Sequence, residues 1–140
     1  MNGNDFMAWV LRSPFHGMLS NGMMIITVTG RKTGKTYTTP VGYYEEGGYL
    51  WIVTNRERTW WKNLQGGAKV GLLLKRKSVQ GTADTELDEK CVETRMYEYL
   101  RHFPQAAKPM EILMQDKKPN AEDIARTAKG RLFVRIKLLN

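Results

Sequence analysis

The sequence of 140 residues has only one cysteine, Cys91, and two histidines, His16 and His102. A single cysteine excludes an intrachain disulfide, and three scattered ligand-type residues match none of the usual zinc-binding spacings. No apolar run approaches the roughly 20 residues that a membrane helix needs. The first residues also lack the basic start and apolar stretch of a signal peptide. These absences predict a cytoplasmic protein with no membrane span and no metal site.

Positive charge, by contrast, is abundant and unevenly distributed. The net charge is +8, and residues 31–77 carry ten Lys and Arg against three Asp and Glu. Nearly all of the excess therefore lies in the middle third of the chain. A local excess of this kind favours an anionic partner, either a phosphorylated cofactor or nucleic acid. The alternative is a basic surface that contacts only solvent.

The hydrophobic pattern predicts a single, mainly β domain (α+β class) over residues 1–140. Runs rich in β-branched and aromatic residues indicate about six strands. A long helix is predicted to start at Thr85, with Asp88 completing a capping box, and to end at Pro104. In this order, a small antiparallel barrel or strongly curved sheet flanked by helices is expected. The predicted strands are 23–29, 36–44, 49–54, 69–74, 78–83 and 132–138; shorter helices are predicted at 5–11, 15–19, 60–65 and 121–128, and a loop at 105–120.

The segment Gly30–Thr36, with the sequence G-R-K-T-G-K-T, has the composition of an anion site. Glycines let a ligand approach the backbone, while main-chain N–H groups, hydroxyls and cations can bind it. A nucleoside-triphosphate loop is excluded, because the spacing is one residue short and the next segment is β-branched with Pro40. The five residues 31–35 are instead predicted to form a hairpin loop.

Three further segments offer groups that could contact a ligand. Thr38–Pro40 places a proline in a strand, which is typical of an edge or a bulge. Thr54–Thr59 supplies polar and basic residues where a strand ends. Trp60–Leu64 holds two indoles beside Lys62 and Asn63, and an indole pair more often packs in a core than stacks on a ligand.

Together these segments resemble the deazaflavin-dependent nitroreductase family. Thr29–Val41 is similar to its signature T-G-R-[KS]-[TS]-G-[KQ]-x-[RV]-x-x-P-[LV], and Trp60–Leu64 is similar to its W-Y-x-N-L segment. Ser13–His16 resembles the S-P-x-H that precedes the first strand of that family. The three motifs occur in the family's order, and the resemblance covers roughly residues 12–85.

The resemblance implies a split antiparallel β-barrel of the flavin-reductase and pyridoxamine-phosphate-oxidase-like superfamily. It also implies an oxidoreductase, similar to nitroreductases and quinone reductases, that transfers hydride between coenzyme F-420 and a small organic substrate. The cofactor supplies the chemistry in such an enzyme, so no catalytic acid or base is predicted. Members of the superfamily include homodimers, which makes a homodimer one expected state.

By the same resemblance, the hairpin tip meets the phosphate and acidic tail of F-420, and the second strand lines its ring system. The end of the third strand would continue the groove, and the tryptophan segment would shape the ring pocket or hold the loop. The cofactor-binding residues implied in this way are Arg31, Lys32, Thr33, Gly34, Lys35, Thr38, Thr39, Pro40, Val41, Thr54, Asn55, Arg56, Arg58, Trp60, Trp61 and Asn63.

One departure from the family pattern leaves alternatives open. Only residues 55–59 separate the third strand from the tryptophans, without the glycines and proline of the family's longer loop. Flavin mononucleotide, which has a phosphate but no acidic tail, is therefore the alternative cofactor. The alternative functions are a basic β-barrel that binds single-stranded nucleic acid through its aromatic rings, and a non-catalytic family member that binds flavin or haem.

Overall fold

The structure, a computed structural model, describes residues 22–139. The predicted helices at 5–11 and 15–19 and the segment Ser13–His16 lie outside these residues. Contacts divide the chain into two compact units. The sheet unit comprises the chain up to Ile52, Thr59–Thr85 and the chain from Val134 on, and the helical unit comprises Val53–Arg58 and Glu86–Phe133.

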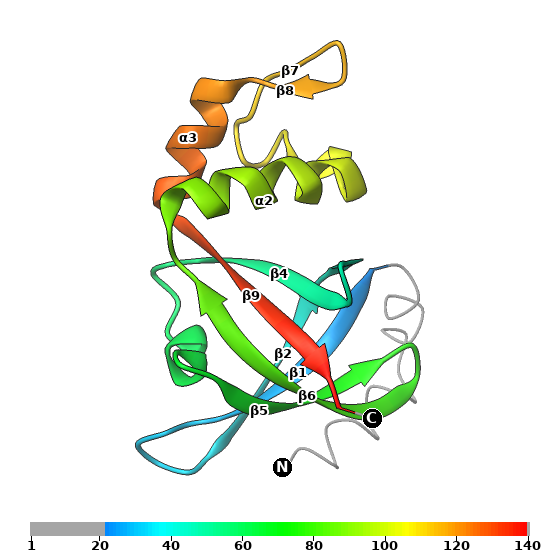
Figure 1. Ribbon diagram of the computed structural model, residues 1–140, viewed down its shortest axis with the longest axis vertical. Coiled ribbons are helices and arrows are strands. Elements are labelled where there is room, and N and C mark those ends of the chain that lie inside the picture. Colours follow the sequence, from blue (N-terminus) through cyan, green and yellow to red (C-terminus); the bar gives the residue numbers. More distant parts are fainter. Residues whose placement is uncertain (1–21, 140) are drawn as a thin grey trace. The chain divides into compact units, whose positions relative to one another are not determined.

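Seven strands form one curled antiparallel sheet in the order β2-β1-β5-β6-β9-β4-β3 (Figure 1). The last strand of the chain lies between β6 and β4, so the sheet is completed only when the C-terminal segment has been added. All six predicted strands are present, and the predicted second strand divides at Tyr43 into β2 and β3. The strand bounds are Met23–Thr29 (β1), Thr36–Gly42 (β2), Tyr44–Glu46 (β3), Tyr49–Asn55 (β4), Ala68–Leu74 (β5), Lys77–Glu86 (β6) and Arg131–Leu138 (β9).

Consecutive buried side chains in β1 and β5 contribute to the core of the sheet unit. Met24 and Ile26 on β1 and Leu72 on β5 are fully buried, and Ile26 pairs with Leu72 across the two strands. Strand β2 lies at the edge of the sheet and pairs only with β1, where Pro40 faces Ile25. The prediction that Pro40 marks an edge strand is confirmed, because an edge strand can lack one ladder donor at no cost.

The helical unit contains the helices α2 (Glu89–His102) and α3 (Ala121–Lys129), which contact each other. The predicted helix start at Thr85 is wrong, because β6 continues to Glu86 and the N-cap is Asp88. The Asp88 Oδ2 atom accepts a hydrogen bond from the Cys91 N–H at 3.1 Å, which satisfies one of the free amides of the first turn. Pro104 ends the helix as predicted and opens the short 3-10 helix η3 (Pro104–Ala106).

The segment predicted as a loop at 105–120 is mostly irregular, but it contains a small hairpin. Strands β7 (Met114–Gln115) and β8 (Lys118–Pro119) pair with each other. The two residues at its tip, Asp116 and Lys117, both have positive φ angles, of 51° and 64°. Two positive φ angles match the twist of a two-residue hairpin loop. The hairpin could not be predicted, because its tip lacks the Asn-Gly or Asp-Gly pair that signals such a turn.

Candidate functional site

The β1–β2 hairpin presents the basic segment that the sequence singles out. Its tip is closed by the Gly30 N–H, which donates to the Lys35 carbonyl at 2.7 Å, and by the Gly34 N–H, which donates to the Gly30 carbonyl at 2.9 Å. The Lys35 N–H donates to the Thr33 hydroxyl at 3.2 Å. Gly34 has a φ of 72°, a conformation that glycine adopts without strain. These three amides are used within the loop, so side chains of the tip are left to meet an anion.

Arg31 connects the hairpin tip to the tryptophan segment. Its N–H donates to the Asn63 Oδ1 atom at 3.1 Å, and its guanidinium donates to the carbonyls of Gln65 and Gly67. Asn63 in turn donates from Nδ2 to the Trp60 carbonyl at 3.2 Å. Two of the predicted site residues, Arg31 and Asn63, are 32 positions apart in the sequence and contact each other in the structure. Their shared role in the structure is to fix the hairpin.

Lys32 and Lys35 differ from Arg31 because their side chains form no hydrogen bond or ion pair with another residue in 22–139. Both side chains are exposed, as are Thr33 and Gly34. Two ammonium groups and one hydroxyl on a loop of fixed shape suit a phosphate, because cations form strong charge-assisted hydrogen bonds to its oxygens. The donor set of the tip therefore fits the phosphate and acidic tail of F-420.

The edge strand β2 carries the predicted ring-binding residues. Thr38, Thr39 and Val41 are half-buried, and Pro40 is exposed. Thr38 pairs with Thr27 of β1, and Thr39 pairs with Ile26. Because β2 has β1 as its one neighbour in the sheet, backbone groups on its other side are not used by the ladder.

The tryptophan segment forms the 3-10 helix η2 (Trp60–Leu64), which packs on β1 and β5. Trp61 and Leu64 are buried, so this indole belongs to the core, whereas Trp60 is half-buried. The Trp61 Nε1–H is buried without a hydrogen-bond partner in the described part of the chain. A buried donor of this kind is costly unless a water or a ligand atom accepts from it.

The predicted residues at the end of β4 belong to the helical unit. Thr54 is buried, Asn55 and Arg56 are half-buried, and Arg58 is exposed. Arg56 donates from Nε to the Arg131 carbonyl at 2.8 Å and from Nη2 to the Leu87 carbonyl at 2.6 Å. Its main-chain N–H also donates to the Gly130 carbonyl at 3.0 Å. The guanidinium of Arg56 thus joins three segments of its own unit.

Sequence reasoning missed the backbone acceptors of these arginines. Gln65 and Gly67 were predicted only as the end of a helical turn. The carbonyls that bind Arg31 flank Gly66, and both Gly66 and Gly67 have positive φ angles, of 80° and 99°. The adjacent pair of glycines was the available signal, since two such residues allow an irregular turn that exposes carbonyls.

A curled antiparallel sheet with a basic hairpin at one edge defines the class of split-barrel oxidoreductases that bind flavin-type cofactors. Residues 13–108 match the family model of the F420H(2)-dependent quinone reductases. The match covers more than half of the chain, and the protein belongs to this family. It is therefore a cofactor-dependent oxidoreductase whose family uses reduced F-420. The family prediction is confirmed, and the nucleic-acid and non-catalytic alternatives are not favoured.

Solved structures confirm the split-barrel fold. A Listeria innocua protein provisionally assigned to the pyridoxamine 5'-phosphate oxidases aligns with a TM-score of 0.56 and 12% identity, over 96% of this chain and 94% of that one. An F420-H2-dependent reductase aligns with a TM-score of 0.52 and 19% identity, over 81% and 93%. A general stress FMN/FAD-binding protein from Xanthomonas citri aligns with a TM-score of 0.52 and 13% identity, over 89% of this chain and 83% of that one.

Two negative findings complete the comparison. No curated protein matches the chain. Among residues 22–139, no helix is both long enough and apolar enough to cross a membrane.

Proposed function

We propose that this protein reduces a quinone with F420H2 and that Lys32 and Lys35 hold the phosphate and acidic tail of the cofactor. The observation that carries this proposal is the pair of exposed ammonium groups, without carboxylate partners among the described residues, on a loop fixed by hydrogen bonds. A cation without an internal partner does not have to break a hydrogen bond or ion pair within the protein when it binds an anion. The family description supports the choice of a quinone as the electron acceptor.

Arg31 and Asn63 act in this proposal as positioning residues. The Arg31 guanidinium is directed at the carbonyls of Gln65 and Gly67, so its charge is partly satisfied before any cofactor binds. A loop held in one shape loses less conformational entropy on binding than a free loop does. Thr38, Thr39, Pro40 and Val41 would lie along the ring system, where the edge strand has backbone groups that no other strand among residues 22–139 pairs with.

F-420 supplies the hydride in this reaction, and the chain's own residues bind, orient and shield the ring. No side chain has to act as a nucleophile or as a general base. Thr54, Asn55 and Arg58 stay predicted contacts, and the bonds of Arg56 support a structural role for that residue.

The test is a fluorescence titration of F-420 into the protein and into two double variants of equal charge. K32A/K35A removes the proposed phosphate ligands, while K69A/K137A removes two exposed lysines elsewhere in the sheet unit. Loss of two charge-assisted bonds at an exposed site should weaken binding by about tenfold or more. K69A/K137A should stay within about twofold. Equal loss in both variants would show that only the overall charge matters.

Activity is measured separately, as oxidation of F420H2 by a short-chain benzoquinone. Turnover that falls in K32A/K35A and recovers at saturating cofactor supports the proposal. Tight binding of F-420 without any oxidation by the quinone would refute the assigned substrate and leave the cofactor site intact.

A further inference from the structure

We propose that the helical unit carries a second anion-binding pocket, which takes a small organic acid through the guanidinium of Arg131. The pocket has a volume of about 360 Å³ and lies entirely within the helical unit. That volume is at the lower end of small-molecule sites. Its lining includes Asn55, Arg56 and Glu57 at the end of β4, and Arg126, Thr127 and Arg131 around the junction of α3 and β9.

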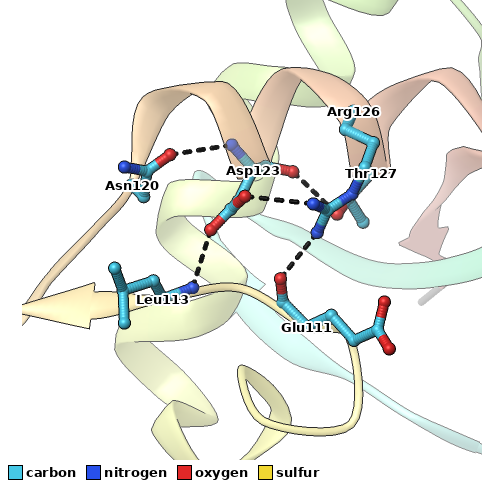
Figure 2. Close-up of polar contacts among 6 residues, drawn as sticks. All are labelled: Glu111, Leu113, Asn120, Asp123, Arg126 and Thr127. Carbon is cyan, nitrogen blue, oxygen red and sulfur yellow. Dashed lines mark hydrogen bonds and ion pairs between the residues drawn. The ribbon is translucent and has the colours of Figure 1, made fainter.

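The cations of the pocket outnumber its acids. Three arginines line it, against Glu57 as the one carboxylate in the lining. Arg126 is neutralised, because its Nη1 atom lies 3.0 Å from Asp123 Oδ1 and its Nη2 atom donates to the Glu111 carbonyl (Figure 2). Glu57 is exposed and forms no ion pair with any residue in 22–139. Arg56 and Arg131 therefore remain as two charges without a carboxylate.

Arg56 and Arg131 differ in how many donors they have left. The Nε and Nη2 atoms of Arg56 are bonded to carbonyls at 2.8 and 2.6 Å, which holds its charge in place at the pocket wall. The side chain of Arg131 has no hydrogen bond or ion pair to another described residue, although Arg131 is half-buried. A partly desolvated guanidinium with all its donors unused favours a ligand that accepts two parallel hydrogen bonds.

The charges around Arg131 are consistent with an anion that binds the pocket with modest affinity. Arg131 is close enough to Tyr99 for its charge to lower the pKa of that phenol, against the larger raising effect of burial. Two features oppose the ligand, namely Glu57 and the carbonyls at the C-terminal end of α3, which carry partial negative charge. A carboxylate of the ligand fits the planar fork of the Arg131 guanidinium. The Asn55 side chain is half-buried and has no hydrogen bond to another described residue. Its amide can therefore bind a second polar group of the ligand.

The loop that borders the pocket is fixed by α3. Asp123 accepts from the Leu113 N–H at 2.9 Å through Oδ2, and the side chain of Asn120 accepts from the Asp123 N–H at 3.0 Å (Figure 2). Thr127 donates from its hydroxyl to the Asp123 carbonyl at 2.8 Å, so this hydroxyl can only accept from a ligand. Specificity for an anion must therefore come from Arg131 and Asn55.

The test is calorimetric titration of succinate, with inorganic phosphate in a second arm, into wild type and three variants. R131A removes the fork, R131K keeps the charge without the fork, and K129A removes an exposed cation two residues away, at the end of α3, that does not line the pocket. We expect succinate to bind about tenfold more weakly to R131A, with R131K intermediate and K129A within about twofold of wild type. Thermal midpoints of all variants show whether each remains folded.

Several results would overturn this pocket. Succinate that fails to bind wild type at millimolar concentration rules it out, and equal losses in R131A and K129A reduce it to a general charge effect. Phosphate that binds while succinate does not refutes the assignment to organic acids. Asn55 is a predicted F-420 contact but Arg131 is not, so F-420 affinity should be unchanged in R131A; a parallel loss of F-420 binding would show that the two sites are one.

Discussion

Replacing Arg56 with alanine tests whether the end of β4 is held by hydrogen bonds to the backbone. The substitution removes two bonds from a half-buried guanidinium, to the Arg131 carbonyl at 2.8 Å and the Leu87 carbonyl at 2.6 Å. Leu87 directly precedes the N-cap of α2, and Arg131 is the first residue of β9. The main-chain bond from Arg56 to the Gly130 carbonyl survives the change. The loss is therefore confined to the side chain.

The expected destabilisation follows from these two bonds. A hydrogen bond with one charged partner contributes about 1.5–3 kcal/mol, and partial access to water lowers that value. For the pair we expect a loss of about 2–4 kcal/mol in the free energy of unfolding. Arg56→Lys keeps the charge but can satisfy only one carbonyl well, so about half of that loss is expected.

The measurement is urea-induced unfolding followed by circular dichroism. Arg58→Ala is the matched control, because Arg58 is exposed, lies two residues away and has no side-chain bond to the described residues. It should change stability by no more than about 0.5 kcal/mol. If Arg56→Ala and Arg58→Ala unfold within 0.5 kcal/mol of each other, the carbonyl bonds contribute nothing and the argument fails.

Three further predictions concern packing, capping and pH. Gly81→Ala places a Cβ atom 2.6 Å from Ile136 Cγ2 and 3.0 Å from the Lys137 carbonyl, so it should cost about 1–3 kcal/mol in unfolding, whereas Gly71→Ala meets its nearest atom at 3.5 Å and should be close to neutral. Asp88→Ala removes the N-cap of α2 and should lower stability by about 1 kcal/mol in thermal unfolding, while Asp88→Asn retains most of it; equal losses would contradict the cap. Burial raises the pKa of Tyr99 above its ordinary value of 10.0, with Arg131 opposing the shift. A raised folded-state pKa gives stability that is complete below the unfolded pKa and is lost as pH rises through the folded pKa. Tyr99→Phe should therefore weaken the decline in unfolding free energy above about pH 10, and an unchanged pH profile would refute the shift.

The strands could be predicted from the sequence because local composition determines them. Met23–Thr29 has the apolar, β-branched composition of a buried strand, and residues 132–138 alternate apolar residues with Arg135 and Lys137. The pairing of β9 between β6 and β4 could not be predicted, since no local signal encodes which strands meet. The start of α2 was placed too early, because Thr85 satisfies a capping pattern while its backbone continues the ladder of β6. Tertiary pairing overrode a local preference at that point.

The different contacts of the predicted site residues could not be derived from the sequence. Arg31 and Lys32 look equivalent in the sequence, as adjacent cations of one motif. Arg31 bonds to the carbonyls of Gln65 and Gly67, which are 34 and 36 positions away, and Lys32 has no such partner within the described residues. Contacts over that separation depend on the packing of η2 against β1, which the spacing of charges does not reveal.

This division gives the concentrated positive charge of residues 31–77 a more specific meaning. A guanidinium that donates to backbone carbonyls fixes a segment, and its remaining charge still contributes to the local potential. An ammonium or guanidinium without an internal partner has only water to lose when it binds an anion. Binding therefore costs less free energy than it does for a cation that must first break a bond within the protein. Arg31 and Arg56 belong to the first kind, while Lys32, Lys35 and Arg131 belong to the second. We therefore propose that the number of donors that a cation has left, rather than its position in a basic cluster, distinguishes a positioning residue from a binding residue in this protein.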